Sequence, residues 1–438
     1  MAVSPLEDRY KTEMNSIFSE ESKLRSWIRV EIALAHANEK LGIAPKGSAA
    51  EIEAAGKKVQ LSRVLQIESE IHHDLMAMVK ALSEQCKTYG GYVHLGSTSY
   101  DIEDTATALI FLDAISVIEK HLLETKQILR SLALSKKSLV CMGRTHGQHA
   151  VPTTYGLKFA IYYCEVKRHL QRLQEARSQI AFGKMSGATG TMATFRGKGF
   201  AVQELVMKEL SLHPSPASNQ VIQRDRHAQS LFALALISAT LEKIAKEIRN
   251  LQRSELMEIS EPFGAKQVGS STMPQKRNPH KSERICSLAR LVRSNVQTAL
   301  ENIPLEHERD LTNSANERFI FPESFIVTDY MLLQMNSILS GLVFYPKNIE
   351  RNLQLTGGLI MSERIMIELT HAGMGRQDAH ELVRTAAQES FTKQIPFSDV
   401  LSKNAHVKKL LGKKLPELLN PKTYVGEAEK IVENALKE

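Results

Sequence analysis

The clearest regularity of the chain is a helical spacing of apolar residues between positions 224 and 259, a stretch without glycine or proline. Its apolar side chains follow one another at intervals of four, three, four and three residues, at Ile237, Leu241, Ile244, Ile248 and Leu251. This spacing places them on one stripe of an α-helix. It therefore predicts a long amphipathic helix that packs along its whole length.

Two further stripes predict two more long helices. One contains Phe111, Ile115, Ile118, Leu122, Leu129 and Leu132, and a weaker one contains Val166, Leu170, Leu173 and Ile180. Segments of more than 25 residues, about 45–50 Å long, are typical of helical bundles. Few runs alternate with period two, and 138–142 is a candidate for a short extended piece. The expected fold is all-α, with a long central bundle whose stripes are covered by self-association.

Breaks in the helical pattern suggest three parts. Shorter helices are expected in an N-terminal domain, residues 1–97, and in a C-terminal domain, residues 346–438. The long helices belong to a central domain, residues 98–345. We find no internal repeat and no low-complexity linker between these parts.

The charge balance narrows the choice of partners. The net charge is +7 and the isoelectric point is about 9.0, but basic and acidic residues are interspersed without long blocks of one sign. A polyanionic metabolite therefore explains the balance at least as well as nucleic acid does, and no nucleic-acid partner is expected. The N-terminus has no apolar signal segment, and the apolar run 231–241 is too short to span a bilayer. No membrane partner is expected.

Cysteine usage favours a reduced compartment. The cysteines form no CxxC pair and have no zinc-site spacing; they are Cys86, Cys141, Cys164 and Cys286. Widely separated single cysteines indicate reduced, mostly buried thiols and a cytoplasmic protein. No cluster of carboxylates and histidines has metal-ligand spacing, so no metal site and no cofactor are expected.

The polar stretch Gly269–Pro279, with the sequence GSSTMPQKRNP, interrupts the helical pattern. Gly269 permits unusual backbone angles, two prolines exclude a regular helix, and the hydroxyl residues favour turns. The hydrogen-bond donors of this loop, with Lys276 and Arg277, suit an anion with several oxygens. Taken alone, the stretch could also be a basic surface turn.

Three further polar segments contain histidine: VHLGSTSYD at 93–101, GRTHGQHAVPTT at 143–154 and HERDLTNSANER at 307–318. In the second, Pro152 and Thr153 look like first-turn and capping residues of a helix. We therefore expect His146 at a helix start. A lone histidine in such a place is more often structural than functional, so the pattern alone leaves its role open.

The stretch Gly269–Pro279 resembles the signature loop of the fumarase/aspartase superfamily, whose members eliminate fumarate or a related acid by cleaving a C–N or C–O bond. Within this superfamily, the strings GRTHGQHA, HERD, SANER and STSYDIEDT resemble those of adenylosuccinate lyases, and the resemblance covers essentially the whole chain. It implies a fumarase/aspartase-like fold. It also implies cleavage of adenylosuccinate to AMP and fumarate, and of the succinylated aminoimidazole carboxamide ribotide (SAICAR) to its carboxamide and fumarate.

The resemblance also implies roles for single residues. Ser270 matches the general base and His146 the general acid, while Lys276 and Asn278 match groups that hold the succinyl carboxylates. The full set of expected substrate contacts is Arg9, Tyr10, His73, Asp74, His94, Thr98, Ser99, Gln220, Ser271, Lys276, Arg277, Asn278, Arg284, Arg309, Ser314 and Arg318. Arg309, Ser314 and Arg318 match ligands of the nucleotide and its phosphate.

Some of these assignments have plain structural alternatives. His73 could belong to a helix face that only packs, Gln220 could cap a loop, and Arg9 could lie in a disordered terminus. Arg284 and Ala315 stand where Asn and Ser are common in bacterial members, which leaves the nucleotide contacts at these two positions open.

The resemblance further implies a homotetramer in which each active site combines segments of three subunits, acting on small-molecule substrates without a cofactor. Two rival hypotheses remain. Another lyase of the superfamily, such as an argininosuccinate lyase, would act on a substrate without phosphate. A non-catalytic structural protein on the same fold, as in some lens crystallins, would not need His146, Ser270 and Lys276, which are intact in this chain.

Overall fold

The structure is a computed structural model that describes residues 4–437; residues 1–3 and 438 of the expected terminal domains lie outside the described residues. The chain divides into two compact units. Unit 1 consists of residues 1–123, 168–241 and 287–333, and unit 2 consists of residues 124–167, 242–286 and 334–438. The three-part division expected from the sequence stays a prediction.

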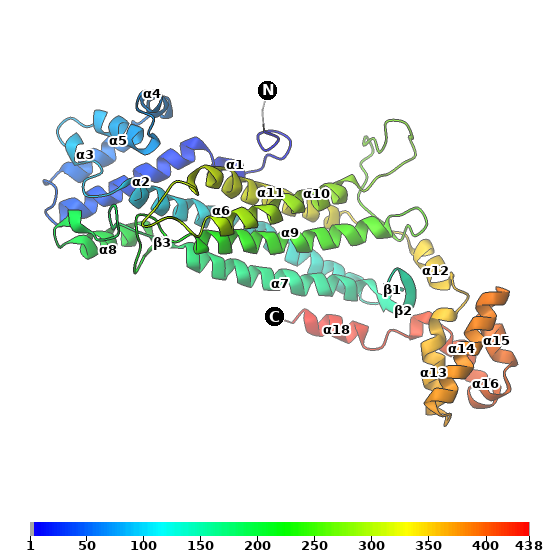
Figure 1. Cartoon of the computed structure of the whole chain (residues 1–438). Coiled ribbons are helices and arrows are strands. Elements are labelled where there is room, and N and C mark those ends of the chain that lie inside the picture. Colours follow the sequence, from blue (N-terminus) through cyan, green and yellow to red (C-terminus); the bar gives the residue numbers. More distant parts are fainter. Residues whose placement is uncertain (1–3, 438) are drawn as a thin grey trace. The chain divides into compact units, whose positions relative to one another are not determined.

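Helices dominate both units, and the predicted all-α fold is confirmed (Figure 1). Five long helices contribute residues to both units: α6 (Ser99–Ser135), α7 (Tyr155–Ile180), α9 (Asp225–Leu251), α10 (His280–Glu301) and α11 (Ser314–Ser340). Helices α6, α7 and α9 have 37, 26 and 27 residues, so each of the three predicted helices exceeds 25 residues.

Unit 1 adds shorter elements to its share of the long helices. They are α1 (Met14–Ile17), α2 (Glu20–Lys40), α3 (Ser48–Gly56), α4 (Leu61–Ile71), α5 (Asp74–Glu84), η1 (Gly90–Tyr92), β3 (Phe182–Gly183), η2 (Ala193–Phe195), α8 (Gly199–Leu210) and β4 (His213–Pro214). Helix α2 packs against α3 and α8, and α4 packs against α5. A core that includes Trp27 and Phe195 holds these elements together.

Unit 2 contains a hairpin and the C-terminal helices. Its further elements are β1 (Val140–Thr145), β2 (Gln148–Thr154), β5 (Ile259–Ser260), β6 (Val343–Phe344), α12 (Pro346–Gln354), η3 (Leu359–Met361), α13 (Ser362–His371), α14 (Arg376–Lys393), α15 (Phe397–Lys403), α16 (Ala405–Leu410), η4 (Gly412–Lys414), α17 (Leu415–Leu418), η5 (Pro421–Thr423) and α18 (Ala428–Ala435). A separate apolar core, which includes Phe397 and Leu401, holds the five helices from α13 to α17 together.

The stripe predicted between positions 224 and 259 is buried within a single chain. Its residues Ile237, Leu241, Ile244, Ile248 and Leu251 are only 1–3% exposed. The buried stripe confirms the predicted helix. However, the expectation that another copy must cover this stripe is wrong, because the chain's own helices already cover it.

The second polar segment forms a hairpin, which corrects one expectation. Strands β1 and β2 pair antiparallel, and Pro152 lies opposite Met142 rather than in a helix. Helix α7 begins only at Tyr155, where the Leu157 amide donates a hydrogen bond to the Thr154 hydroxyl at 3.2 Å. Thr154 is therefore the capping residue, and β-branched side chains before it favour a strand. Of the extended piece expected at 138–142, residues 140–142 belong to β1.

His146 lies in the turn of this hairpin instead of at a helix start. Its φ is 53° and that of Gly147 is 75°, as a two-residue turn of the type I′ class requires. On β1, a Cβ atom at Gly143 would lie 2.5 Å from the Val151 carbonyl oxygen. Glycine at 143 thus allows the strands to approach, and the turn presents the exposed His146 side chain to solvent.

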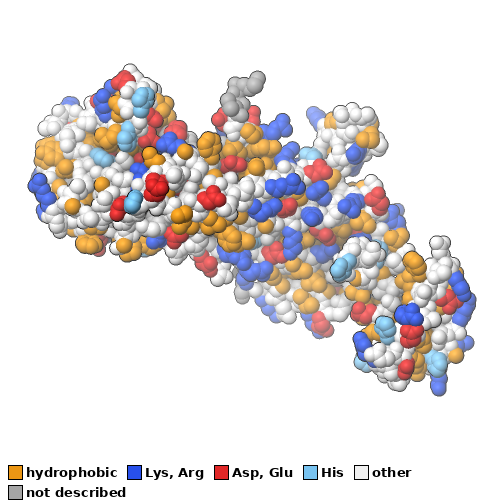
Figure 2. Space-filling model, in the orientation of Figure 1, with side chains coloured by type: hydrophobic (Ala, Val, Ile, Leu, Met, Phe, Trp, Pro, Cys, Tyr) orange, Lys and Arg blue, Asp and Glu red, His pale blue; other side chains and the backbone are white. Residues whose placement is uncertain are grey.

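Charged side chains are intermixed over the visible face of the molecule (Figure 2). All four cysteines are free, and Cys141 and Cys286 are buried. Within the described residues, α9 is the one helix long and apolar enough to cross a membrane by length and composition. In its most apolar window, 67% of the residues are buried in the chain, so the helix also fits the core of a folded protein.

Candidate active site

A cavity of about 300 Å³ in unit 1 brings together six of the expected site residues. They come from the start of α5, the start of α6 and the region at and before α11: His73, Asp74, Ser99, Arg309, Ser314 and Arg318. Tyr100 and Glu103, which the sequence reasoning did not single out, complete the wall together with Glu68, His72 and Leu311. Residues far apart in the sequence thus surround one space of ligand size.

Ion pairs and stacking fix the two arginines of this cavity. Arg318 donates a hydrogen bond to Asp74 at 2.6 Å, and Arg309 lies 3.7 Å from the centre of the Tyr100 ring. Arg309 also donates to the Gln220 side-chain oxygen at 2.9 Å. Burial alone would raise the pKa of Asp74, but the bonds from Arg318 and from the Leu75 amide outweigh it and lower that pKa. Asp74 is therefore a carboxylate that orients Arg318.

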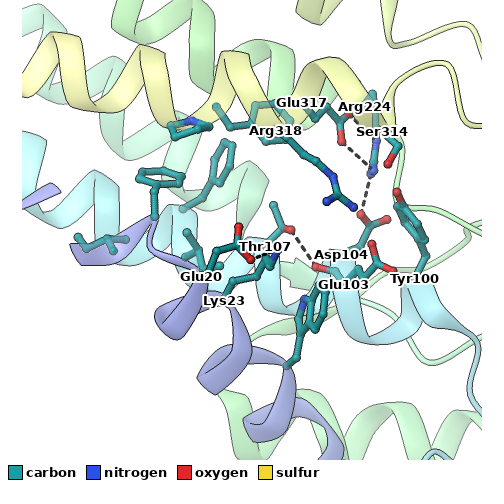
Figure 3. A pocket seen from close by; sticks show the side chains of 17 residues that line it. Glu20, Lys23, Tyr100, Glu103, Asp104, Thr107, Arg224, Ser314, Glu317 and Arg318 are labelled. Carbon is teal, nitrogen blue, oxygen red and sulfur yellow. Dashed lines mark hydrogen bonds and ion pairs between the residues drawn. The ribbon is translucent and has the colours of Figure 1, made fainter. Parts of the chain in front are cut away.

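A second cavity of about 180 Å³ adjoins the same side chains (Figure 3). Buried Arg224 contacts Asp104 at 2.9 Å and Glu317 at 3.0 Å, and it separates these two carboxylates. Tyr100, Glu103, Ser314 and Arg318 line both cavities. In Figure 3 the Arg318 guanidinium points into the space between these groups.

The first polar segment is held by buried Asp101. Its carboxylate accepts hydrogen bonds from the amides of Thr98 at 2.9 Å and Ser186 at 2.9 Å, and it pairs with buried Lys184. The bond to Thr98 resembles the second half of a capping box at the start of α6. It sets the first turn of α6, so that Ser99 faces the cavity.

Several expected nucleotide-side residues do not line either cavity. His94 bonds through Nδ1 to buried Glu31 at 2.6 Å; burial alone would lower its pKa, but the Glu31 carboxylate raises it. Tyr10 packs edge-on against Tyr330 with ring centres 5.1 Å apart. Arg9 is exposed, and Thr98 makes its bond to Asp101. Gln220 reaches the cavity indirectly, through its bond to Arg309.

In unit 2, a buried carboxylate anchors the hairpin that carries His146. Glu258, which is 0% exposed, accepts hydrogen bonds from Arg144 Nη2 at 2.5 Å and from the Tyr155 hydroxyl at 2.6 Å. A third bond comes from Asn352 Nδ2 at 2.9 Å. Arg144 precedes the turn of the hairpin and Tyr155 follows its second strand, so Glu258 fixes both strands on either side of His146.

The stretch 269–279 forms a loop in unit 2 whose two ends touch. A Cβ atom at Gly269 would lie 1.8 Å from the Lys276 carbonyl oxygen, so only glycine fits there. Asn278 donates a hydrogen bond to the Gly269 carbonyl at 2.9 Å. The Ser270 hydroxyl oxygen accepts from the amides of Thr272 at 3.3 Å and Met273 at 3.1 Å. Two N–H groups therefore already point at this oxygen.

Lys276, Arg277 and Asn278 line a third cavity, of about 590 Å³, in unit 2. Ser271 is exposed in the loop and Arg284 lies in α10; neither of them lines one of the three cavities. Within residues 4–437, no hydrogen bond or ion pair joins His146 to Ser270, and no group of three or more His, Cys, Asp or Glu could hold a metal ion.

Comparison with known proteins agrees with these observations. A family model described as "Lyase" matches residues 8–294, and one described as "Adenylosuccinate lyase C-terminus" matches residues 358–435. The chain is 53% identical to adenylosuccinate lyase of Pyrococcus abyssi, covering 100% of this chain and 98% of the relative. It is 40% identical to adenylosuccinate lyase of Aquifex aeolicus, covering 97% and 98%. This chain belongs to the adenylosuccinate lyase family. The predicted family is thereby confirmed.

Solved structures place this family member in a wider group of lyases and related enzymes. The 3-carboxy-cis,cis-muconate lactonizing enzyme from Pseudomonas putida aligns with a TM-score of 0.91 at 32% identity, over 99% of this chain and 98% of that one. A fumarate lyase from Mesorhizobium sp. BNC1 aligns with a TM-score of 0.90 at 31% identity, over 97% of both chains. The predicted fumarase/aspartase-like fold is confirmed.

Proposed function

We propose that this adenylosuccinate lyase family member cleaves adenylosuccinate to AMP and fumarate, and SAICAR to its carboxamide and fumarate. The observation that carries the proposal is the cavity of unit 1. Two arginines, Arg309 and Arg318, and the hydroxyl group of Ser314 line this space of about 300 Å³. Arginine and hydroxyl donors of this kind suit a phosphate group, which both substrates carry.

The nucleotide side of the reaction is assigned to unit 1. Arg309, Ser314 and Arg318 are proposed to hold the phosphate, with Ser99 at the start of α6 close by. The remaining proposed contacts on this side are Arg9, Tyr10, His73, Asp74, His94, Thr98 and Gln220. Support comes from the bonds that fix Arg309 and Arg318, since pre-oriented donors lose little entropy on binding.

The chemical steps are assigned to His146 and Ser270 of unit 2. Ser270, as an alkoxide, takes a proton from the carbon next to a succinyl carboxylate. The resulting charge spreads onto that carboxylate, where Lys276 and Asn278 stabilise it. Protonated His146 then gives its proton to the leaving nitrogen as the C–N bond breaks. The two amides directed at the Ser270 oxygen support this role, because they would stabilise the alkoxide as they do the hydroxyl.

Kinetics on adenylosuccinate, followed by the loss of its absorbance, tests these roles. We expect His146→Gln and Ser270→Ala each to lower kcat by about 10²–10⁴ while circular dichroism stays unchanged. His149→Gln is the matched control, since His149 is a second histidine of the same hairpin, and it should retain most activity. Turnover near that of the wild type in either test variant would refute that assignment. Activity on argininosuccinate alone, or none on any substrate, would instead support one of the rival hypotheses.

We further propose a homotetramer with active sites shared between subunits. Exposed large apolar side chains in unit 1 support association: Phe232 is 53%, Leu291 45% and Phe319 72% exposed. Light scattering should give about four times the chain mass of 49.0 kDa. Mixing inactive His146 and Ser270 variants should restore partial activity, because some sites would receive both intact residues. A stable, active monomer would contradict the proposal.

The chain is proposed to act in the cytoplasm, because its four free thiols favour a reducing compartment.

The loop 269–279 is proposed to close over the succinyl group. A closing loop would exclude water from the carbanion. Hydrogen exchange of the amides from Ser270 to Asn278 should slow by at least about tenfold when AMP and fumarate bind. Equal protection with and without these ligands would show a loop that is already closed.

A further inference from the structure

Glu103 is a residue of the unit 1 cavities for which the family resemblance gives no role. It lies on α6 one turn after Ser99, on the same face of the helix. It lines the cavity that contains Arg309 as well as the adjoining smaller cavity. Figure 3 shows it beside Asp104 and Tyr100, at the end of the pocket toward which Arg318 points.

Among the described residues, the carboxylates of Asp74 and Asp104 have hydrogen-bonding partners, whereas that of Glu103 has none. Asp74 accepts from Arg318 at 2.6 Å, and Asp104 accepts from Arg224 at 2.9 Å and from the Ile222 amide at 2.7 Å. In the described part of the chain, the Glu103 carboxyl group makes no hydrogen bond or ion pair. It is therefore a polar group beside a ligand-sized space whose hydrogen-bonding capacity is unused.

The surroundings favour the neutral form of this group. Burial, followed by repulsion from Asp74 and Asp104, raises the pKa of Glu103 to about 8, although Arg309 and Arg318 act in the opposite direction. Near neutral pH the carboxyl group is then mostly protonated and carries one O–H donor. An anion bound between the two arginines would repel an ionised Glu103, so its arrival favours the protonated form further.

We propose that Glu103 is a proton-linked ligand contact. Its neutral carboxyl group donates a hydrogen bond to an oxygen of the phosphate monoester that Arg309 and Arg318 attract, and binding in alkaline solution takes up one proton. This inference deepens the proposed function and rests on it for the identity of the ligand. The proton moves from solvent to a Glu103 carboxyl oxygen, and no covalent bond of the ligand changes.

Other titratable and charged groups also face this space and need to be separated from Glu103. They are Glu20 and Lys23 of α2, Glu68 and His72 at α4, His73 and Asp74 at α5, Tyr100 and Asp104 of α6, Arg224 before α9, Arg309 before α11, and Glu317 and Arg318 of α11. Burial raises the pKa of Tyr100 to about 12, beyond the range of the experiment. All these groups remain in Glu103→Gln, so any pH dependence they cause persists in that variant.

Calorimetric titration of the full-length wild-type enzyme with AMP, and separately with inorganic phosphate, tests the proposal between about pH 8 and pH 9.5, where the phosphate groups of both probes are already largely dianionic. We expect the wild-type Kd to rise with pH, approaching about tenfold per pH unit above pH 8, as uptake of one proton requires. Titrations in two buffers of different ionisation enthalpy should show proton uptake near one per site at about pH 9.

Glu103→Gln keeps a neutral donor of the same size and should bind both probes with a Kd that changes less than about threefold over this range. Glu68→Gln is the matched control, because it removes a carboxylate from the wall of the same cavity. Its Kd for both probes should rise with pH as steeply as that of the wild type. Equal slopes in wild type and Glu103→Gln, or no proton uptake by the wild type, would overturn the proposal.

Two other outcomes separate this inference from the proposed function. If Glu103→Gln weakens binding of AMP but not of phosphate, without a change in slope, Glu103 accepts from a ligand hydroxyl and the proposal is wrong. If neither probe binds the wild type while adenylosuccinate is still cleaved, the proton-linked contact is wrong and the function stands. If the wild type has no lyase activity but its Kd rises with pH, and this rise disappears in Glu103→Gln, the proton-linked contact is supported and the proposed function is refuted.

Discussion

Replacing Glu258 with alanine is expected to destabilise the hairpin of unit 2 by about 3–5 kcal/mol. Glu258 is fully buried and accepts bonds from Arg144 at 2.5 Å, Tyr155 at 2.6 Å and Asn352 at 2.9 Å. Without it, Arg144, whose side chain is 16% exposed, keeps its charge but loses its carboxylate partner. A buried charge left without a partner accounts for most of the expected loss.

Two further variants divide this loss into its causes. Glu258→Gln keeps the shape and one acceptor oxygen but removes the negative charge, so about 1–3 kcal/mol is expected from the unsatisfied donors. Glu247→Ala is the control: Glu247 pairs with Lys158 at 2.7 Å, but these side chains are 31% and 23% exposed. Solvent screening limits such a pair to about 1 kcal/mol or less.

Hydrogen exchange of the hairpin amides, from 140 to 154, is the suitable assay. The chain has a single tryptophan, Trp27, and it belongs to unit 1, so its fluorescence would not report on the hairpin. A loss of 3–5 kcal/mol corresponds to exchange faster by about 10²–10³ or more. The kcat should fall as well, because the hairpin carries His146. Exchange in Glu258→Ala that matches Glu247→Ala within a factor of about three would refute the reasoning.

Three other predictions concern single contacts. Gly269→Ala should lower kcat by at least about tenfold at unchanged overall stability, because its Cβ would lie 1.8 Å from the Lys276 carbonyl in an otherwise exposed loop; kinetics and thermal unfolding check this. Arg309→Lys should raise the Kd for AMP by about tenfold in calorimetry, since lysine loses the planar stacking on Tyr100. The pKa of Glu103 is about 8 in the folded chain, compared with an ordinary value of 4.5. Between pH 4.5 and pH 8 the folded state therefore binds one proton more than the unfolded state, and the wild-type protein loses stability as the pH rises through this range. The Tm of Glu103→Gln relative to wild type should therefore increase from about pH 5 to about pH 8.

The sequence was sufficient to predict the long helices because their apolar spacing directly determines which side becomes buried. The stripe from Ile237 to Leu251 is buried as expected. Spacing does not reveal which chain covers a stripe, and here the cover comes from the same chain. The hairpin at 140–154 was missed because Pro152 and Thr153 occur at helix starts and in edge strands alike, and only pairing with β1 decides between them.

The site could be predicted only in part, for a similar reason. Polar segments with histidine, glycine and hydroxyl residues marked 143–154 and 269–279 as interruptions of the helical pattern. The family resemblance supplied residues such as Arg309 and Arg318, which do share a cavity. Glu103 was not singled out, although its spacing of four from Ser99 was a usable signal. Its proposed role depends on Asp74 and Asp104 being nearby. Asp74 in turn pairs with Arg318, 244 residues away in the sequence, and the sequence pattern does not reveal such a tertiary contact.

The two groups of residues proposed to bind and to cleave the substrate differ in how firmly they are held, and this difference should appear in kinetics. In unit 1, Arg318 is hydrogen-bonded to Asp74 and Arg309 to Gln220, so the proposed binding groups are already oriented. In unit 2, His146 lies in an exposed turn, and Lys276 is exposed in a loop whose ends are joined by the hydrogen bond from the Asn278 side chain to the Gly269 carbonyl. Pre-oriented groups that contact the unreacting part of a substrate affect ground state and transition state alike, so their removal raises KM. Groups that must be brought into position contribute mainly in the transition state, so their removal lowers kcat.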